Sequence, residues 1–312
     1  MMRRAAFVGA SAAFGLSIGV ATAQTSSPLR IGYSPVGWTL GEGYLSDHGG
    51  FFKRAGLTVE MTTLTNGAAI NAGVIAGALD IGATNVGSVA SAHARGLPVA
   101  LIAPSIVSTA GRRPMTAVSV LASSSIRQPR DLVGKTICVS AVRDLQQASI
   151  MNWLDQNGVD PQSVKFLEIP IPQMLSTLRA GRVDAASLAE PWLAAGGTDV
   201  RVLGAPYDTL APEIMLSGWV ATRAWIAANG PTLKRFIEAI AATAAWGNSN
   251  PAPALKMVEE MSGLSPELAE RMARPTLGER LVPSQIQPII DTTAKYGFLT
   301  RSFPAEEIIA TV

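Results

Sequence analysis

One α/β unit occurs twice in this chain, and this repeat limits the possible folds more than any other feature of the sequence. Short apolar runs alternate with helical stretches over residues 29–103, and the same order returns over residues 135–188. The pentapeptide AGALD, which ends at Asp80, is echoed by AGRVD, which ends at Asp184, 104 residues later. Such alternation is typical of βαβ units with parallel strands, so the doubled unit predicts two similar α/β lobes.

Hydrophobic periodicity and helix start and stop signals give the elements of both units. In the first unit we expect strands at 29–33, 57–61, 80–83 and 99–103, with helices at 66–76 and 86–95. In the second unit we expect strands at 135–140, 164–169 and 183–188, with helices at 145–157 and 172–180. The C-terminal third has helical patterns at 232–246, 254–261, 266–273 and 284–296, and we expect these helices to pack on the first lobe.

Two further β-prone runs suggest how the lobes are connected. They cover residues 116–121 and 215–221, and we expect them to cross between the lobes as hinge strands. The predicted first lobe then comprises residues 28–115 and 222–312, and the second lobe comprises residues 122–214. Within the repeat, Gly77 and Gly181 fit helix C-termini with positive φ, which makes Asp80 and Asp184 structural residues.

The first 23 residues have the layout of a secretory signal peptide. Arg3 and Arg4 precede an apolar, small-residue run, and Ala21-Thr22-Ala23 resembles a cleavage site. A membrane anchor needs a longer apolar run, so we expect cleavage after Ala23 and a periplasmic, monomeric mature protein. The twin-arginine route remains an alternative to general secretion, because the arginine pair fits both.

Charge and composition argue against several functional classes. The chain has 25 basic and 23 acidic residues, and removal of Arg3 and Arg4 makes the two numbers equal, so we expect no nucleic-acid partner. With one Cys and two His, a zinc site would lack ligands, so no metal or cofactor is predicted. Cys138 lies in an apolar run and is expected to be a buried thiol.

Several segments together resemble a known family. They are GYSP at 32–35, GFFKRAGLTVE at 50–60, AGALDIG at 76–82, DLVGKTI at 131–137, GRVDA at 181–185 and EPW at 190–192. In this order they are similar to the periplasmic substrate-binding proteins of the aliphatic-sulfonate, taurine, nitrate and thiamine-precursor ABC importers. The resemblance implies a type II periplasmic-binding-protein fold, in which two α/β lobes joined by two crossing hinge strands close over a small molecule. It also implies delivery of that molecule to an ABC permease and its ATPase.

Ligands of open α/β sheets bind beyond the carboxyl ends of the strands, so the residues after each predicted strand are candidate ligand contacts. After the first strand, Trp38 can stack on a flat ligand and Thr39 follows it; packing of Trp38 within the lobe is the alternative. After the third strand, Asn85 or Ser88 can donate to a ligand oxygen. Asn85 is equally suited to capping the following helix.

The second lobe offers a parallel set of candidates. Ser140 ends its first strand, and Arg143 stands where relatives commonly carry a Gly-Ser or Gly-Thr anion cradle. Arg143 can bind a carboxylate or sulfonate with two hydrogen bonds, or it can be a solvated surface residue. Asp144 is expected to be a helix cap.

Three more candidates carry alternative structural roles. Glu190 and Trp192 follow the last strand of the second unit. Glu190 can recognise a cation, and it can at least equally stabilise a helix N-terminus. Trp219 lies in the second predicted hinge strand, where it can line the cleft, although a core or hinge role is favoured.

The leading hypothesis is therefore an exported, non-enzymatic protein that binds a small anionic or heteroaromatic solute. An enzyme on the same fold, similar to thiamine-pyrimidine synthases or menaquinone-pathway enzymes, is the competing class, although the chain beyond the predicted signal peptide lacks a Gly-x-Ser-x-Gly elbow, a His-Glu-x-x-His helix and a phosphate loop. A ligand-sensing module is a third class. The sequence leaves the solute unidentified.

Overall fold

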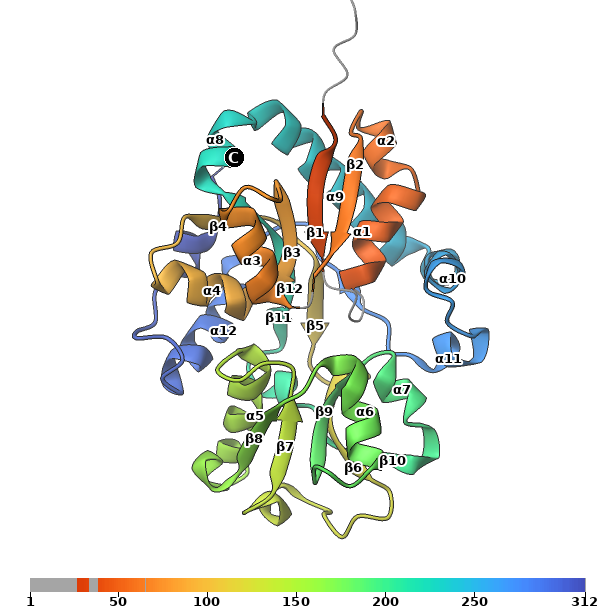
Figure 1. The fold of residues 1–312 in the computed structure, drawn as a ribbon, viewed down its shortest axis with the longest axis vertical. Coiled ribbons are helices and arrows are strands. Elements are labelled where there is room, and N and C mark those ends of the chain that lie inside the picture. The colour runs from red at the N-terminus through yellow and green to blue at the C-terminus, as the bar shows by residue number, and fades with distance from the viewer. Residues whose placement is uncertain (1–26, 34–38, 65, 312) are drawn as a thin grey trace, which may run out of the picture.

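A computed structural model describes residues 27–33, 39–64 and 66–311, and these form two α/β lobes with a third, small sheet between them (Figure 1). The sheet of lobe 1 has the strand order β2-β1-β3-β12-β4. Its strands are β1 (Leu29–Tyr33), β2 (Val59–Thr63), β3 (Ile81–Asn85), β4 (Val99–Pro104) and β12 (Ser217–Thr222). The sheet of lobe 2 has the order β10-β6-β9-β7-β8. Its strands are β6 (Thr116–Leu121), β7 (Thr136–Val139), β8 (Lys165–Glu168), β9 (Ala185–Ala189) and β10 (Val200–Gly204).

The two sheets share one plan, as the sequence repeat predicts. In lobe 1, β1 pairs in parallel with β2 and β3, and β12 runs antiparallel between β3 and β4. In lobe 2, β7 pairs in parallel with β8 and β9, and β6 runs antiparallel between β9 and β10. Each lobe therefore has a parallel three-stranded part extended by an antiparallel strand from elsewhere in the chain.

The echoed aspartates occupy equivalent places in the two lobes. Asp80 accepts a hydrogen bond from the backbone N–H of Arg30 at 2.9 Å, and Asp184 accepts one from the backbone N–H of Thr136 at 2.9 Å. Gly77 and Gly181, three residues before them, have φ values of 71° and 66°. The prediction of helix-ending glycines is confirmed, and each aspartate ties the start of one strand to the first strand of its sheet.

Helices cover the faces of both sheets. Those of lobe 1 are α1 (Thr39–His48), α2 (Phe51–Arg54), α3 (Gly67–Ile75), α4 (Val86–Ala94), α8 (Arg223–Ala228) and α9 (Gly230–Ser249). Those of lobe 2 are α5 (Leu145–Gln156), α6 (Ile171–Arg179) and α7 (Trp192–Ala195). The last three α-helices are α10 (Pro251–Ser262), α11 (Pro266–Arg271) and α12 (Pro283–Lys295).

The passage between the lobes differs from the predicted hinge strands. Residues 116–121 form β6, which lies inside the sheet of lobe 2, and residues 215–221 are divided between β11 and β12. The crossing runs instead through a third sheet of order β11-β5-β13, made of β5 (Ile106–Thr109), β11 (Glu213–Met215) and β13 (Thr276–Leu277). An apolar β-prone run has the same pattern in a hinge as in a sheet centre, so the pattern could not distinguish them.

The C-terminal helices pack on lobe 1 and also reach lobe 2 on two sides. In Figure 1, α12 lies beside α4, and α10 and α11 lie on the opposite side of the molecule. At the end of α12, Lys295 Nζ lies 2.8 Å from the carboxylate of Asp155 on α5. Next to α11, the backbone N–H of Ala273 donates to Glu190 Oε1 at 2.8 Å. The interface between the lobes is thus held at both flanks.

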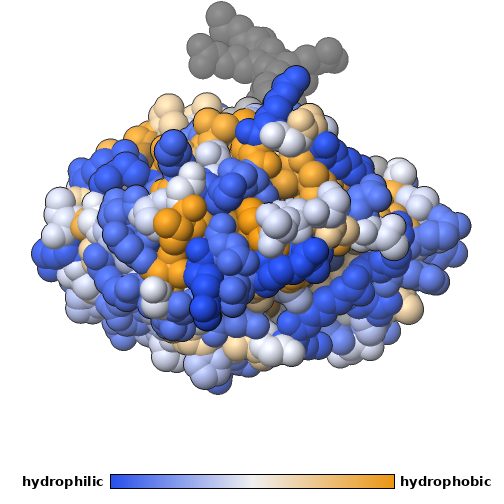
Figure 2. Space-filling model, turned by 90° about the horizontal axis from the view of Figure 1, so that it is seen from below, coloured by the Kyte–Doolittle hydropathy of each residue, from blue (hydrophilic) through white to orange (hydrophobic). Residues whose placement is uncertain are grey.

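The surface of lobe 2 mixes hydrophilic residues with smaller apolar groups (Figure 2). Among the described residues, the exposed large apolar side chains all belong to this lobe: Val133, Val142, Leu167 and Val202. Two of them lie on its edge strands β8 and β10. Within the described ranges, every helix falls short of the length and apolar character needed to cross a membrane.

Candidate functional site

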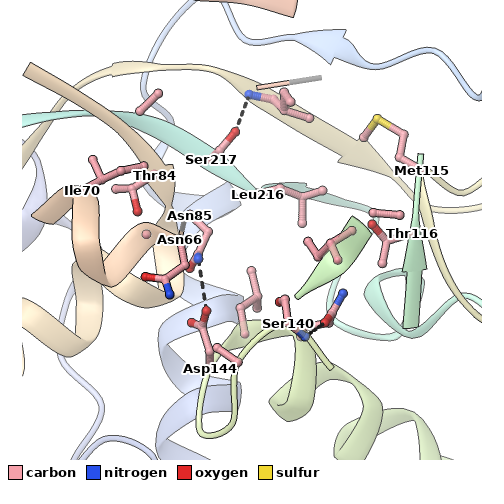
Figure 3. A pocket seen from close by; sticks show the side chains of 18 of the residues that line it. Asn66, Ile70, Thr84, Asn85, Met115, Thr116, Ser140, Asp144, Leu216 and Ser217 are labelled. Carbon is pink, nitrogen blue, oxygen red and sulfur yellow. Dashed lines mark hydrogen bonds between the residues drawn. The ribbon is translucent and has the colours of Figure 1, made fainter. Parts of the chain in front are cut away.

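A cavity of about 440 Å³ lies between the two lobes, and residues from both lobes and from the connecting strands form its walls. Its polar lining residues are Asn66, Thr84, Asn85, Thr116, Ser140, Asp144, Gln146, Glu168, Glu190, Tyr207 and Ser217. Its apolar lining residues include Ile70, Ile106, Met115, Leu145, Ile171 and Leu216. Figure 3 shows the side chains of Thr84 and Asn85 facing those of Ser140 and Asp144 across this space.

The walls consist of strand ends and helix beginnings, as expected for an open α/β sheet. The carboxyl end of β3 and the start of α3 come from lobe 1, and the ends of β7, β8 and β9 come from lobe 2. At such ends the chain leaves the sheet, so side chains and free backbone groups are available to a ligand. Each copy of the repeat therefore supplies one wall of the site.

Asn85 and Asn66 hold the lobe 1 wall in place as helix caps. Asn85 Oδ1 accepts from the N–H of Ser88 at 2.7 Å, and Asn66 Oδ1 accepts from the N–H of Ala69 at 3.0 Å. The same Asn85 side chain also crosses the cavity: its Nδ2 donates to Asp144 Oδ2 at 3.1 Å (Figure 3). Asn85 thus couples the start of α4 to lobe 2.

Thr84 lies beside this cap and leaves one polar group unused. Thr84 is 2% exposed and lines the cavity. Its hydroxyl has no hydrogen-bond partner among the described residues. A buried hydroxyl without a partner is energetically unfavourable by about 1–3 kcal/mol. A ligand or a water in the cavity can remove this cost.

The β7–α5 loop of lobe 2 is closed by side chains of the same lobe. The N–H of Ser140 donates to Gln146 Oε1 at 2.6 Å, and the N–H of Arg143 donates to Gln147 Oε1 at 2.6 Å. Between them, the N–H of Val142 donates to Glu168 Oε2 at 3.1 Å. Three backbone donors that would otherwise face an incoming group are therefore already satisfied.

The charged residues in the lining of the cavity are all acidic. Three carboxyl groups, those of Asp144, Glu168 and Glu190, belong to its lining, and the described lining residues include no Lys, Arg or His. The segments 34–38 and 65 also contain no basic residue in their sequence. Burial raises the pKa of Asp144, although hydrogen bonds oppose that shift, and burial likewise raises the pKa of Glu190. Burial also raises the pKa of Tyr207, and the negative charge of the nearby Asp144 raises it further.

Of the residues predicted from the sequence, Asn85, Ser140 and Glu190 line the cavity. Ser88 does not belong to the lining. Its backbone N–H donates to Asn85 Oδ1, the bond by which Asn85 caps α4, and its hydroxyl lies near Gly67. Trp38 lies outside the described residues. Thr39 begins α1, and its side chain likewise lies outside the described part of the chain.

Arg143 does not reach the cavity, in contrast to its predicted role as an anion contact. Its backbone φ is 59°, a left-handed conformation that is unusual for a residue other than glycine. Its guanidinium donates to the carbonyl oxygen of Gly297 at 2.7 Å and lies 5.2 Å above the ring of Phe298. Arg143 therefore connects lobe 2 to the segment after α12.

Glu190 lines the cavity, but both of its carboxylate oxygens accept backbone hydrogen bonds. Oε2 accepts from the N–H of Ala194 at 3.0 Å, and Oε1 accepts from the N–H of Ala273. The residue is 1% exposed, so its carboxylate stabilises the start of α7 and the contact with the C-terminal segment. Trp192 packs against an apolar cluster of lobe 2 and is not part of the lining.

Trp219 lies in the core of lobe 1 rather than at the cavity. It is completely buried in β12, its ring packs edge-on against Phe236, and its Nε1–H donates to Glu42 Oε2 at 2.9 Å. Glu42 is also completely buried, and burial raises its pKa to about 8. Of the two roles considered for Trp219, the structure assigns it the core role.

Several lining residues escaped the sequence analysis. Thr116 and Ser217 are the first residues of β6 and β12, and Gln146 lies inside α5. Glu168 ends β8, and Tyr207 lies in a 3-10 turn. The strand-end rule applies to Glu168, which is the last residue of β8, and could have identified it. The others approach the cavity because of the placement of the two lobes, which leaves no local pattern in the sequence.

The described residues contain no group of three or more His, Cys, Asp and Glu side chains arranged to hold a metal ion. Cys138 is buried in β7, and burial raises the pKa of its thiol to about 12. A thiol with so high a pKa stays protonated at neutral pH, which makes it a poor nucleophile.

Comparison with known protein sequences gives consistent similarities. The profile of a protein family described as NMT1/THI5 like matches residues 41–254. The formylaminopyrimidine-binding protein of Halalkalibacterium halodurans is 24% identical over 220 residues, which cover 69% of this chain and 64% of that protein. The taurine-binding periplasmic protein of Escherichia coli is 24% identical over 224 residues, covering 69% of this chain and 65% of that protein. The chain thus matches slightly less than two thirds of the length of each relative.

Solved structures with low sequence identity share the fold. The alkanesulfonate-binding protein SsuA of Xanthomonas axonopodis pv. citri, bound to MOPS, aligns with a TM-score of 0.76 at 17% identity, covering 92% of this chain and 99% of that chain. The periplasmic nitrate-binding protein NrtA of Synechocystis PCC 6803 aligns with a TM-score of 0.72 at 11% identity, covering 91% and 85%. The predicted periplasmic-binding-protein fold is therefore confirmed.

Proposed function

Because the chain belongs to the NMT1/THI5-like family, we propose that it is a solute-binding protein of an ABC importer. It captures a small molecule in the cavity between its lobes and delivers it to a membrane permease and its ATPase. The observation that carries this proposal is the cavity itself, which is walled by strand ends of both lobes. Its volume of about 440 Å³ lies within the usual range for small-molecule sites.

The connections between the lobes support a mechanism of closure on the ligand. The lobes are joined through the short strands β5 and β11, and a few residues at such positions can absorb a hinge rotation. A solute that contacts both walls binds the closed form more tightly than the open form, so it shifts the population toward closure. The permease can then distinguish loaded from empty protein by shape.

The relatives support binding rather than catalysis, since the named ones are binding proteins. The arrangement of the cavity supports the same conclusion. Two lining carboxyl groups have a raised pKa: Asp144 accepts a hydrogen bond from Asn85, and Glu190 accepts two from backbone N–H groups. Neither forms the nucleophile and base pair that covalent catalysis needs.

Export is the remaining part of the proposal. Residues 1–23 direct the chain to the periplasm and are removed after Ala23. The intact mass of protein recovered from a periplasmic fraction tests this directly, because cleavage at Ala23 leaves Gln24 as the first residue. A mass that still includes Arg3 and Arg4 would contradict it.

The binding function is tested by thermal unfolding of the mature protein with a panel of sulfonates, carboxylates, amines, nitrate, pyrimidines and flavins. A ligand at about one hundred times its Kd stabilises the folded state by roughly 2.7 kcal/mol, which raises Tm by a few degrees at this size. Mass spectrometry of the hit before and after incubation separates binding from turnover. Consumption of the compound, or a panel without any shift, contradicts the proposed function.

A further inference from the structure

The walls of the cavity also carry information on the charge of the solute, given the proposed function. An anion site in a protein needs unsatisfied N–H donors, a basic side chain, or both. The β7–α5 loop is the natural place for such donors in lobe 2, because it precedes the N-terminus of α5. Whether the backbone N–H groups of this loop are free or already hydrogen-bonded therefore indicates whether an oxyanion is expected there.

The donors of this loop are occupied by the protein's own oxygens. Gln146, Gln147 and Glu168 accept the backbone N–H groups of Ser140, Arg143 and Val142 respectively. The Glu168 group is a carboxylate, so the protein itself places a negative charge where an oxyanion would have to sit. An incoming anion would have to displace it and would then be repelled by it.

The other charged groups near the cavity also disfavour an anion. Arg143, the one basic residue of the loop, is turned away to Gly297 and Phe298. Asp144 and Glu190 add two further carboxyl groups to the lining, without a basic side chain among the described lining residues; Arg113, whose charge lowers the pKa of Glu190, lies outside the lining. A cation in the cavity would favour the charged form of both carboxyl groups, which desolvation otherwise disfavours.

Thr84 supplies a second, independent observation on the opposite wall. Its buried hydroxyl lines the cavity and lacks a partner among the described residues. A hydroxyl can accept a hydrogen bond from an N–H donor of a ligand and can also donate one. Thr84 thus provides a polar contact for the solute on the lobe 1 side, whereas the charge preference depends on the carboxyl groups of lobe 2.

We propose that the cavity selects a small cationic solute, such as an ammonium or amidinium compound, over oxyanions of similar size. Glu168 and Asp144 face its positive group from lobe 2, and Thr84 accepts from it or from a neighbouring N–H on the lobe 1 side. The apolar lining, with Ile70, Ile106 and Met115, contacts the rest of the molecule.

The test uses probes of matched shape and different charge on the mature protein. Benzamidine, benzamide and benzoate form one set, and butylamine, butanol and butanesulfonate form another. Isothermal titration calorimetry gives the Kd of each. We expect the cation of a set to bind about tenfold or more tightly than its anion.

A double variant identifies the residues responsible. Glu168→Gln with Asp144→Asn keeps an oxygen acceptor for Val142 and for Asn85, so it removes charge while preserving the hydrogen-bond geometry. We expect it to lose the preference for the cation, whereas Glu270→Gln, an exposed carboxyl on α11, keeps that preference.

The outcomes separate the two proposals. Tighter binding of the anion, or of an oxyanion from the broad panel, overturns the cationic class and leaves the binding function intact. An unchanged preference in the double variant also overturns the assignment to Glu168 and Asp144. If neither panel yields a binder, the proposed function fails together with this inference.

Discussion

Asn85 Nδ2 donates to Asp144 Oδ2 at 3.1 Å, and this hydrogen bond joins lobe 1 to lobe 2 across the cavity (Figure 3). The same asparagine caps α4, so one side chain connects a helix of lobe 1 to the ligand wall of lobe 2. The bond exists in this arrangement of the lobes and must break when they separate. It therefore contributes to closure independently of a solute.

Asn85→Asp tests this contact. Aspartate caps a helix as well as asparagine does, but it places a second carboxylate next to Asp144, and like charges repel. We expect the variant to be more open at pH 8, with a larger radius of gyration by small-angle X-ray scattering, and less so as the pH is lowered, because protonation of either carboxyl group removes the repulsion. The stability of α4 should change little.

Asn66→Asp is the matched control, because Asn66 caps α3 in the same manner and also lines the cavity. The structure gives it no bond to Asp144, so its scattering should equal that of the unmodified protein. If Asn85→Asp scatters like this control at pH 8, the cross-cavity hydrogen bond does not influence closure.

Glu42 gives a prediction for the pH dependence of stability. Its folded pKa is raised to about 8, whereas a carboxyl in the unfolded chain titrates near about 4.3. Between these pH values the folded protein holds a proton that the unfolded chain has released. The free energy of unfolding therefore decreases as pH rises through this window, by up to about 1.4 kcal/mol per pH unit, and levels off above the folded pKa.

Glu42→Gln removes this titration and keeps an oxygen acceptor for the indole N–H of Trp219. Urea unfolding at pH 5, 6.5 and 8 should show the variant gaining stability relative to the unmodified protein as pH rises. Glu238→Gln, an exposed residue of α9, serves as control and should follow the unmodified protein at each pH. A parallel curve for Glu42→Gln would mean that Glu42 is ionised in the folded state.

The repeated aspartates yield a prediction about two independent sites. Asp80 and Asp184 each accept a backbone N–H from the neighbouring strand, and Asp80 also pairs with the Arg30 guanidinium at 2.8 Å. Replacing either with alanine leaves that N–H without its acceptor, which costs about 1–3 kcal/mol where the group is shielded from water. The two sites lie in different lobes and share no partner, so we expect the costs to add.

The measurement is urea unfolding of Asp80→Ala, Asp184→Ala and the double variant. Asp80→Asn and Asp184→Asn, which keep a side-chain oxygen for the N–H, should cost less than the alanine variants. If the double variant loses much less free energy of unfolding than the sum of the two single variants, the lobes unfold separately and one lobe alone determines the transition.

The repeat made much of this fold predictable from sequence, because local patterns decide where a regular element begins. The strand predicted at 29–33 is β1, the helix predicted at 145–157 is α5 to within one residue, and Gly77 ends its helix as expected. The edge strand β10 was not predicted. Its half-exposed sequence VRVLG has weak patterning, and its pairing with β6 depends on residues far away in the chain.

The site was predictable only where it follows a strand end. That rule identified Asn85 and Ser140, while Tyr207 and Ser217 reach the cavity through the placement of one lobe against the other. Arg143 illustrates the limit most clearly. Its side-chain direction depends on a positive φ and on Gly297, 154 residues away, and neither can be inferred from the residues around it.

Gly67 gives the last prediction, because it forms part of the lobe 1 wall at the start of α3. A Cβ at this position would lie 2.8 Å from Ser88 Oγ and 3.2 Å from Asn85 Nδ2, and it would also meet Thr84 Oγ1. The methyl group of Gly67→Ala must therefore displace side chains that shape the cavity. We expect ligand affinity to fall by about tenfold or more, which corresponds to roughly 1.4 kcal/mol.

Gly230→Ala is the matched control, since Gly230 also begins a helix, α9, but a Cβ there would meet no atom within 4 Å. Alanine favours a helix over glycine by up to about 1 kcal/mol, so both variants gain the same intrinsic term. Titration calorimetry with the solute that shifts Tm compares the two affinities, and thermal unfolding without solute compares the two stabilities. Equal affinities for Gly67→Ala and Gly230→Ala would show that the solute does not depend on the wall formed by Thr84, Asn85 and α3, and would place its binding contacts elsewhere in the cavity.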